Sequence, residues 1–567
     1  MPLYITCYGG AGEIGGNKIL LEDGALRVFL DFGRPFGRHT QYFDGLLIKE
    51  RSVRGLLDPM ILELLPPLEG LYREDLIPVM DSSHLTIKGE GEKKQVERNP
   101  KAYDDFWKRF RHKRGYRNLQ RDDLPVNAIL ISHAHLDHSG DLVFVRPEIP
   151  VLSSLMTAII SKAVQDSGKP GSAGVVYINP QAIKEDGALE GDRTRGYVWR
   201  NWNFLDQDPQ GDVQKDNPFA STASFWHWRP AKQDKNSTGP SSTQSLQRKP
   251  EWWPLDHSIF GACGFALETS EGWIAYTGDI RFNGSQGFKS WKFAEELAAL
   301  KPLALICEGT YLGVENPHPV TEEKVQANCL EIIRKATGKL IIADFAPRNI
   351  ERLIAFLNIA RDTSRRLVIQ AKDAYLLSAM HLVDPYSVPD LKNESFVAIF
   401  NDPKARRDKW EEITRQFYSG KLVNPSEIGK EPGDYILAFS LWDIADLLDL
   451  EHLEENCLKG GVYIYSNSRA YDEEQKVDLI RLWNWIDHFG MKPVGLTLNQ
   501  IGEVDIIPGY HASGHASESE LVRFVKEVCP RVLIPIHTEQ PQLWEEKLRG
   551  TGIQIKFPSY ANPILLP

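Results

Sequence analysis

Short apolar runs separated by a glycine-rich turn begin the chain. Residues 3–7, 18–22 and 27–31 are apolar or alternate in the manner of strands. Glycines over 9–16 fit the G-x-G-x-x-G spacing of a phosphate loop. The segment after them has the pattern of a strand, whereas a phosphate loop opens a helix. The pattern therefore predicts a tight β-hairpin at this turn.

A different pattern occupies the later part of the chain, where short apolar strands alternate with helices. Residues 339–343 form an apolar run, and Ile350, Leu353, Ile354 and Leu357 after it follow the spacing of one helix face. Strands that alternate with helices favour βαβ units and a largely parallel sheet. Further strand and helix patterns follow at 367–369, 435–439, 462–465 and 472–488.

Two long polar segments, at about 38–124 and 169–251, interrupt the strand pattern of the first half. Within the first, a basic run over 108–117 includes aromatic residues. Two interpretations of this run remain open: a solvated helix face, or a surface that holds a phosphate backbone. The residues proposed for such a surface are Lys108, Arg111 and Arg114.

Composition limits the class of protein. The chain has 567 residues, 42% hydrophobic content and a formal net charge of −11, which fits a globular protein and opposes nucleic-acid binding by bulk charge. A locally positive groove stays compatible with that charge. The cysteines include no C-x-x-C pair, which excludes a zinc ribbon. No run approaches the ~18–20 apolar residues of a membrane span, and the first residues lack a basic leader, so we expect a cytoplasmic protein and no membrane partner.

The strongest chemical signal is a group of ligand-type residues at the end of an apolar strand. The strand pattern over 128–131 is followed by His133, His135, Asp137 and His138, in an H-x-H-x-D-H motif. Alternate residues of an extended segment face one side, so the first two histidines can bind one metal ion together. After a turn, the aspartate and the last histidine can face a second ion. Imidazole nitrogens and a carboxylate suit Zn²⁺.

This motif, after a strand–turn–strand start, resembles the metallo-β-lactamase superfamily. The resemblance implies an α/β fold, the αββα sandwich, with the active site at one edge of two packed sheets. It also implies a third histidine and then an aspartate that bridges the metal ions. His257 and Asp279 follow in that order, and Asp279 ends an apolar strand pattern.

Three later motifs are similar to those of the β-CASP branch of this superfamily, which processes nucleic acids. Glu308 ends an apolar strand, His515 precedes a helix pattern, and His537 ends the last apolar strand. The branch carries an inserted α/β module between the first two motifs, where strands and helices alternate in this sequence. Histidine at the last motif is typical of RNA-directed members. The late motifs look most like RNase J, and the Glu308 motif looks closer to the mRNA 3′-end cleavage endonuclease.

The resemblance implies two Zn²⁺ ions per chain, each bound by three side chains and joined by a bridging carboxylate. Asp137 would also orient the attacking water. His515, paired with Glu308, would protonate the leaving oxygen. The proposed ligands of the first ion are His133, His135 and His257, those of the second are Asp137, His138 and His537, and the bridge is Asp279.

The implied domain division is a metallo-β-lactamase domain over 1–318, a β-CASP module over 319–495, and a return to the first domain over 496–567. The expected activity is a zinc-dependent ribonuclease on single-stranded RNA, with endonuclease and 5′-exonuclease action both open. The alternatives are a DNA nuclease and a hydrolase of esters or lactams. A homo-oligomer is a further expectation.

Four residues are weaker candidates for substrate contacts. Ser466, Ser468 and Arg469 follow a strand of the module, where they could bind a 5′-phosphate or form a plain turn. His511 could contact a substrate phosphate or have a local structural role.

Overall fold

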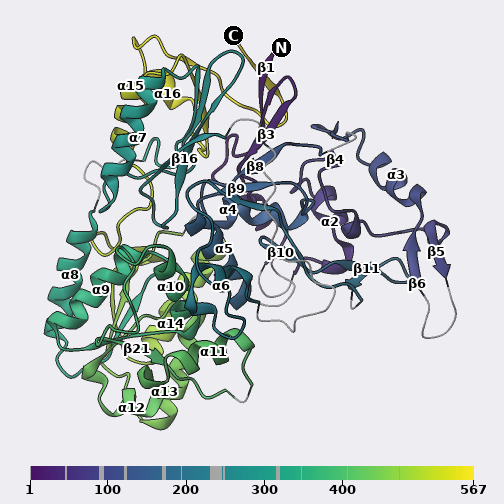
Figure 1. Ribbon diagram of the computed structural model, residues 1–567. Helices are drawn as coiled ribbons and strands as arrows, with labels where there is room; N and C mark the ends of the chain where they lie inside the picture. The colour runs from purple at the N-terminus through teal and green to yellow at the C-terminus, as the bar shows by residue number, and fades with distance from the viewer. Residues whose placement is uncertain are drawn as a thin grey trace.

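The computed structural model describes residues 2–44, 48–88, 95–120, 124–168, 174–192, 194–229, 246, 249–314, 320–346, 348–404, 406–470 and 473–567. Two lobes are visible in the ribbon (Figure 1): a lobe with two facing sheets, called here the sandwich lobe, and an α/β module. The predicted boundary, between residues 318 and 319, lies outside the described residues. The domain division therefore stays a prediction.

Two mixed sheets form the sandwich lobe. In the described residues, the spatial order of the first is β14 (Trp202–Phe204), β9 (Val151–Ser153), β8 (Ala128–Leu130), β3 (Leu26–Leu30), β2 (Lys18–Asp23), β1 (Leu3–Gly9) and β30 (Pro563–Leu566). That of the second is β15 (Glu251–Pro254), β16 (Cys263–Glu268), β17 (Trp273–Tyr276), β18 (Ala304–Glu308), β28 (Val532–Ile536) and β29 (Gln554–Ile555).

The core between these sheets comes from the alternation read in the sequence. Leu3 and Ile5 on β1 point inward, and they share one buried cluster with Ile274, Ile306 and Ile534 of the second sheet. Helices cover the outer faces: α5 (Leu155–Ser167) lies on the first sheet, and α7 (Gly287–Leu300), α15 (Glu518–Val528) and α16 (Leu543–Lys547) lie on the second. The predicted αββα arrangement is confirmed.

The glycine-rich turn is the predicted hairpin. β1 and β2 pair in antiparallel register on either side of it. Gly15 has a φ of 77°, and a Cβ built on it would lie 2.9 Å from the Cβ of Asp137. A glycine is required here both for the backbone conformation and for the close approach of the turn to the metal motif.

The α/β module contains a sheet in which each pair of neighbouring strands is parallel, as predicted. Leu340 and Ile342 face one side of the sheet, and Ile341 and Ala343 face the other. In the described residues the strand order is β22 (Leu422–Val423), β21 (Val397–Phe400), β20 (Arg366–Ile369), β23 (Tyr435–Leu437), β19 (Ile341–Asp344), β24 (Val462–Tyr465) and β25 (Lys492–Val494).

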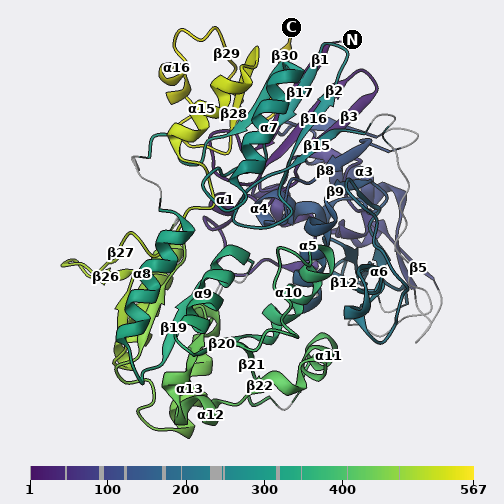
Figure 2. The ribbon, with the colours of Figure 1, turned by 60° about the vertical axis from the view of Figure 1, so that its left-hand side comes forward.

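Helices cover both faces of the module sheet. One face carries α8 (Glu322–Lys335), α9 (Ile350–Asp362), α10 (Ala371–Val383) and α11 (Lys409–Phe417). The other carries α12 (Pro425–Lys430), α13 (Leu447–Leu453) and α14 (Glu473–His488). Figure 2 shows the module below the sandwich lobe, with the hairpin of β26 (Leu496–Leu498) and β27 (Val504–Ile506) at its edge.

The first polar segment packs beside the sandwich lobe, at the right in Figure 1. Its apolar residues, such as Leu65 and Trp107, join the core against Phe29 and Phe32. It contains α1 (Phe36–His39), α2 (Leu57–Ile61), β4 (Leu68–Glu69), β5 (Leu85–Lys88), β6 (Gln95–Arg98), α3 (Pro100–Lys108) and β7 (Arg117–Asn118).

The second polar segment joins the two lobes. Rings of Phe219 and Phe225 lie 5.7 and 5.3 Å from the ring of Tyr375 on α10, and Phe219 lies 5.0 Å from Phe417 on α11. The segment contains β10 (Tyr177–Ile178), β11 (Gln181–Ile183), β12 (Leu189–Gly191), β13 (Val198–Trp199) and α6 (Thr222–His227). In the described part of the chain, no helix is both long and apolar enough to cross a membrane.

Candidate metal centre and cleft

The proposed ligands come from the ends of neighbouring strands. β8 leads into His133 and the short helix α4 (Leu136–Ser139), which carries Asp137 and His138. β17, β18 and β28 run parallel, so their carboxyl ends place Asp279, Glu308 and His537 at one edge of the second sheet. The two sheets thus bring residues more than 400 positions apart in sequence to one site.

A first group of side chains converges around His135. The Nδ1 of His135 lies 3.0 Å from the Nε2 of His133 and 3.2 Å from the Nε2 of His257. Together with an oxygen of Asp279, these nitrogens all lie within 4.8 Å of one another. Three imidazole nitrogens and a carboxylate directed at one point form a donor set that Zn²⁺ accepts.

A second group lies beside it and shares Asp279. The group consists of Asp137, His138, Asp279 and His537, again with ligand atoms within 4.8 Å of one another. Asp279 Oδ2 lies 3.2 Å from His138 Nε2, and Asp279 Oδ1 lies 3.4 Å from His537 Nδ1.

Three polar atoms of this second group are buried and make no hydrogen bond to any described residue: His138 Nε2, Asp279 Oδ1 and His537 Nδ1. Buried polar atoms normally have a partner, and a bound cation supplies one. The residues present therefore fit a metal centre.

Asp31, which sequence reasoning did not identify as a site residue, holds the second group in place. Its carboxylate accepts hydrogen bonds from His138 Nδ1 and from the backbone N–H of Ser132, both at 2.7 Å. The first bond leaves His138 Nε2 free for a metal ion. Asp31 has a φ of 58°, a conformation that costs energy outside glycine. Its position after an apolar strand was the only signal in the sequence.

Electrostatics distinguishes His138 from the other proposed histidine ligands. Burial and neighbouring imidazoles hold the pKa of His133 well below 6.5, so its ring is the neutral form that binds metal. Burial also acts on His138, but the carboxylates of Asp279, Asp137 and Asp31 outweigh it and raise the pKa of His138 well above 6.5. The carboxylates of this site thus favour a positively charged partner, such as a metal ion.

His515 lies at the edge of the cluster and is paired with Glu308, as predicted from the motifs. Its Nδ1 lies 3.1 Å from both carboxylate oxygens of Glu308, and its Nε2 lies 3.9 Å from Asp279 Oδ2. Glu308 is fixed in turn by the backbone N–H of Ile280 at 2.8 Å. Burial lowers the pKa of His515, but Glu308 and Asp279 more than offset it and raise that pKa to about 10. His515 is therefore protonated in this arrangement.

A cleft of about 880 Å³ lies between the cluster and the α/β module. His135 and Asp137 line its sandwich side. Arg348, Lys372 and the exposed ring of Trp442 line its module side. The cleft therefore joins the proposed metal site to cationic and aromatic groups that sequence reasoning missed.

The predicted strand-end contacts are only partly placed in this cleft. Ser468 and Arg469 line it. Ser466 is 2% exposed, and its hydroxyl donates to the carbonyl of Tyr510 and accepts from Arg352. The Ser466 hydroxyl is thus buried and already engaged, which favours the alternative of a plain turn over a substrate contact. The Nδ1 of His511 lies 3.2 Å from the Ser466 carbonyl, which favours the local structural role.

The basic run begins at the end of α3, which lies to one side of the sandwich lobe and apart from the module (Figure 1). Phe110 is 3% exposed and belongs to the core, so the predicted interleaving of aromatic and basic side chains on the surface is wrong for this residue. Arg111 is ion-paired with Asp104 at 2.7 Å. Contacts of Lys108 and Arg114 with a substrate remain predictions.

The fold and the site are similar to those of the metallo-β-lactamase superfamily, and comparisons of the sequence agree. Residues 100–200 match the metallo-beta-lactamase superfamily. Residues 505–558 match the "Zn-dependent metallo-hydrolase RNA specificity domain". The first match includes the H-x-H-x-D-H motif, and the second includes His511, His515 and His537.

Within this class, the chain is similar to ribonuclease J proteins. It is 24% identical over 310 residues to Ribonuclease J of Mycoplasma pneumoniae, which is 53% of this chain and 47% of that protein. It is 22% identical over 291 residues to Ribonuclease J2 of Bacillus subtilis, 50% and 45% of the two chains. The chain thus spans about half the length of these curated relatives. The predicted resemblance to the β-CASP branch and to RNase J is confirmed.

A solved structure shares the fold. The crystal structure of a protein of unknown function from Enterococcus faecalis V583 matches with a TM-score of 0.60 and 18% identity over 100% of both chains.

Proposed function

We propose that this chain is a zinc-dependent ribonuclease that hydrolyses RNA phosphodiester bonds. The observation that carries the proposal is the pair of ligand groups that share Asp279 at the wall of a cleft. The match of residues 505–558 to an RNA specificity domain supports RNA over DNA and over ester or lactam substrates. Similarity to ribonuclease J proteins supports the same choice.

Two Zn²⁺ ions per chain would be bound by the two groups. His133, His135 and His257 would bind one ion, and Asp137, His138 and His537 the other, with Asp279 in contact with both. Bound metal ions would lower the pKa of a water molecule and stabilise negative charge on the phosphate oxygens.

Asp137 has the position of a group that orients the nucleophile. Its side chain is 24% exposed and lines the cleft, whereas the neighbouring His138 is fully buried. Asp137 Oδ2 lies 3.7 Å from His138 Nε2 and 4.0 Å from His537 Nε2. A carboxylate between the ligand group and the cleft can accept a hydrogen bond from the attacking water and fix its direction.

His515 has the position of the general acid. Its Nε2 faces Asp279 while its Nδ1 is held by Glu308, so the ring presents one N–H toward the cluster. The leaving ribose oxygen needs a proton, and a positioned imidazolium can supply it at Nε2. Glu308 is a positioning residue, because it acts through the orientation and charge of His515.

Other parts of the proposal concern the whole protein. The division into a split metallo-β-lactamase domain and a β-CASP module agrees with the two lobes that the sheets form. A cytoplasmic location and a homo-oligomer are further proposals of the same account.

The test uses 5′-labelled single-stranded RNA and DNA of one sequence, each with and without a chelator. We expect RNA cleavage that the chelator abolishes, and little cleavage of DNA. A 5′-mononucleotide product indicates exonuclease action, and internal fragments indicate endonuclease action. Absence of chelator-sensitive RNA cleavage, or faster cleavage of DNA, would overturn the proposal.

A further inference from the structure

A second cavity lies in the first polar segment, apart from the cleft. It encloses about 490 Å³ between α2, the chain around residues 78–84, and α3. None of its lining residues lines the cleft. Its volume falls within the ~300–1,000 Å³ typical of small-molecule sites.

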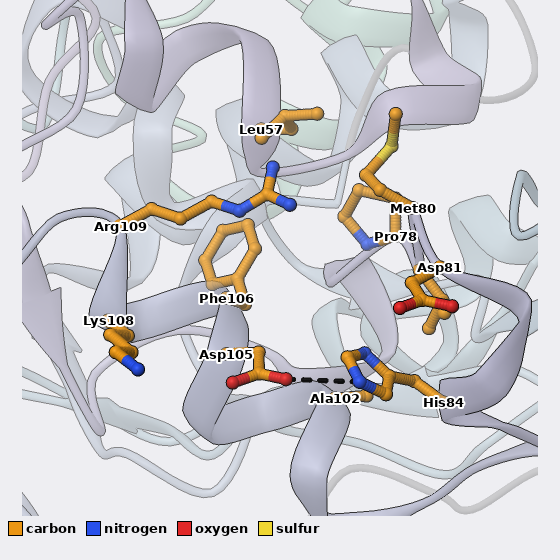
Figure 3. Close-up of a pocket in the computed structure, with 11 residues that line it drawn as sticks. Leu57, Pro78, Met80, Asp81, His84, Ala102, Asp105, Phe106, Lys108 and Arg109 are labelled. Carbon is orange, nitrogen blue, oxygen red and sulfur yellow. Dashed lines mark ion pairs between the residues drawn. The ribbon is translucent and has the colours of Figure 1, made fainter.

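Two cations at the end of α3, the first residues of the basic run, line this cavity. Three neighbouring cations are held by carboxylates at 2.5–2.7 Å: Arg111 by Asp104, Lys113 by Glu63 and Arg117 by Glu22. Lys108 and Arg109 form no ion pair or side-chain hydrogen bond with any described residue, and both line the cavity. Arg109 extends over Phe106 into the opening (Figure 3). A charged group without a protein partner is available for an anion.

The other residues that line the cavity are apolar on one part of its wall and polar on another. Leu57, Pro78 and Phe106 form the apolar part. Across from Arg109, the Nε2 of His84 lies 3.0 Å from Asp105 Oδ2, so this carboxylate already has a partner on the rim (Figure 3).

Asp81 lies on the same rim and adds a carboxylate that a donor group of a ligand could reach. The cavity therefore combines an anion-binding corner, a surface for a flat apolar ring, and a hydrogen-bond acceptor.

We propose that this cavity binds a nucleotide. The phosphate pairs with Arg109, the base lies against Pro78 and Phe106, and Asp81 accepts a hydrogen bond from an amino or hydroxyl group. The choice of a nucleotide among anionic ring compounds rests on the proposed ribonuclease function. Two sources share this chemistry: a free mononucleotide, or one nucleotide of an RNA chain that extends beyond the cleft.

The experiment measures binding of adenosine 5′-monophosphate to the metal-loaded full chain by calorimetry. The test variant is Lys108→Ala/Arg109→Ala. The control is Lys409→Ala/Lys526→Ala, which removes the same charge from exposed positions on α11 and α15 outside the cavity. Binding in the cleft is common to all three proteins, so a difference reports the cavity. We expect the test variant to lose binding at least about tenfold and the control to match the wild type.

A second variant distinguishes a loss of binding from a loss of folding in Lys108→Ala/Arg109→Ala. Met80 lies on the rim and is 52% exposed, so Met80→Glu adds a negative charge without a change in the core. We expect it to weaken binding of the mononucleotide as well. Equal affinities in the wild type and both cavity variants would overturn the proposal.

RNA affinity separates the two sources. If the double variant weakens binding of a long RNA and leaves that of a short one unchanged, the occupant is a nucleotide of the chain. If only mononucleotide binding falls, the occupant is the free nucleotide. The short RNA is also assayed for chelator-sensitive cleavage, which depends on the cleft. If the wild type binds the mononucleotide in the cavity but does not cleave the short RNA, the proposed function is contradicted. If the wild type cleaves the short RNA but the cavity variants bind the mononucleotide as the wild type does, the cavity proposal is contradicted.

Discussion

The metal cluster and the module wall of the cleft are built in different ways. The cluster lies within one lobe, where His133, His138 and His257 are almost fully buried and Asp31 fixes His138. The wall comes from the other lobe and carries exposed side chains, with Trp442 82% exposed. A rigid, buried centre suits chemistry, and an exposed wall suits contact with a long substrate. Changes in the cluster should therefore lower kcat, and changes in the wall should raise KM.

The largest effect is expected at the cluster itself. His133→Ala removes a ring whose Nε2 lies 3.0 Å from His135 Nδ1, so the first ligand group loses a donor. We expect RNA cleavage to fall at least about 10⁴-fold, together with a loss of bound zinc. Cleavage assays and metal analysis of the purified variant check this. Asp137→Ala should be equally inactive, and near-wild-type turnover in either variant contradicts the site.

His515 should give the next largest effect and should separate the acid from the ligands. His515→Ala removes the proposed proton donor while both four-residue groups stay intact. We expect kcat to fall about 10²–10⁴-fold with little change in KM, because a general acid acts in the transition state. Zinc content should stay at two per chain. A fall in zinc content would make His515 a ligand instead.

A change at Asp31 tests whether a residue that only positions a proposed ligand, His138, also affects activity. Asp31→Asn keeps the shape but removes the charge that faces His138 Nδ1 at 2.7 Å. We expect metal affinity or activity to fall about 10–100-fold, as for other residues that orient metal ligands. Tyr276→Phe is the matched control, because it removes a different hydrogen bond to Asp31. Wild-type zinc content and activity in Asp31→Asn would contradict this role of Asp31.

Trp442 should give the smallest effect, confined to binding. Stacking of a base on an exposed indole contributes about 1–3 kcal/mol, and at the lower limit Trp442→Ala would weaken RNA binding about fivefold. The rise should appear in KM with kcat unchanged. Tyr386→Ala is the control, since Tyr386 is fully exposed and does not line the cleft. A fall in kcat at Trp442 would contradict the division between chemistry and binding.

The same comparison explains what the sequence predicted. The cluster could be predicted because four of its residues, from His133 to His138, lie together in the chain at a strand end. The β-hairpin and the parallel module sheet followed from periodicity, which is local as well.

The cleft wall could not be predicted in this way, because Arg348, Lys372 and Trp442 lie on separate segments that only the folded sheet brings together. Ser466 shows the opposite case. Its strand-end position suggested a substrate contact, but Arg352 and the Tyr510 carbonyl occupy its hydroxyl. Pairing partners distant in sequence decide which polar residues stay available.

The two polar segments add a further contrast. The second packs aromatic rings on Tyr375 of the module, whereas the first stays on the sandwich lobe and holds its own cavity. Their composition alone gave no sign of this difference, because contacts across lobes depend on tertiary structure.

The central claim is that the two ligand groups hold metal ions that cleavage of RNA requires. The most direct test removes metal from the purified protein and restores Zn²⁺ in steps while the rate of RNA cleavage is followed. The account predicts no cleavage without metal and full recovery at two equivalents per chain. Cleavage that persists after metal removal, or recovery in the His133→Ala variant, would contradict it.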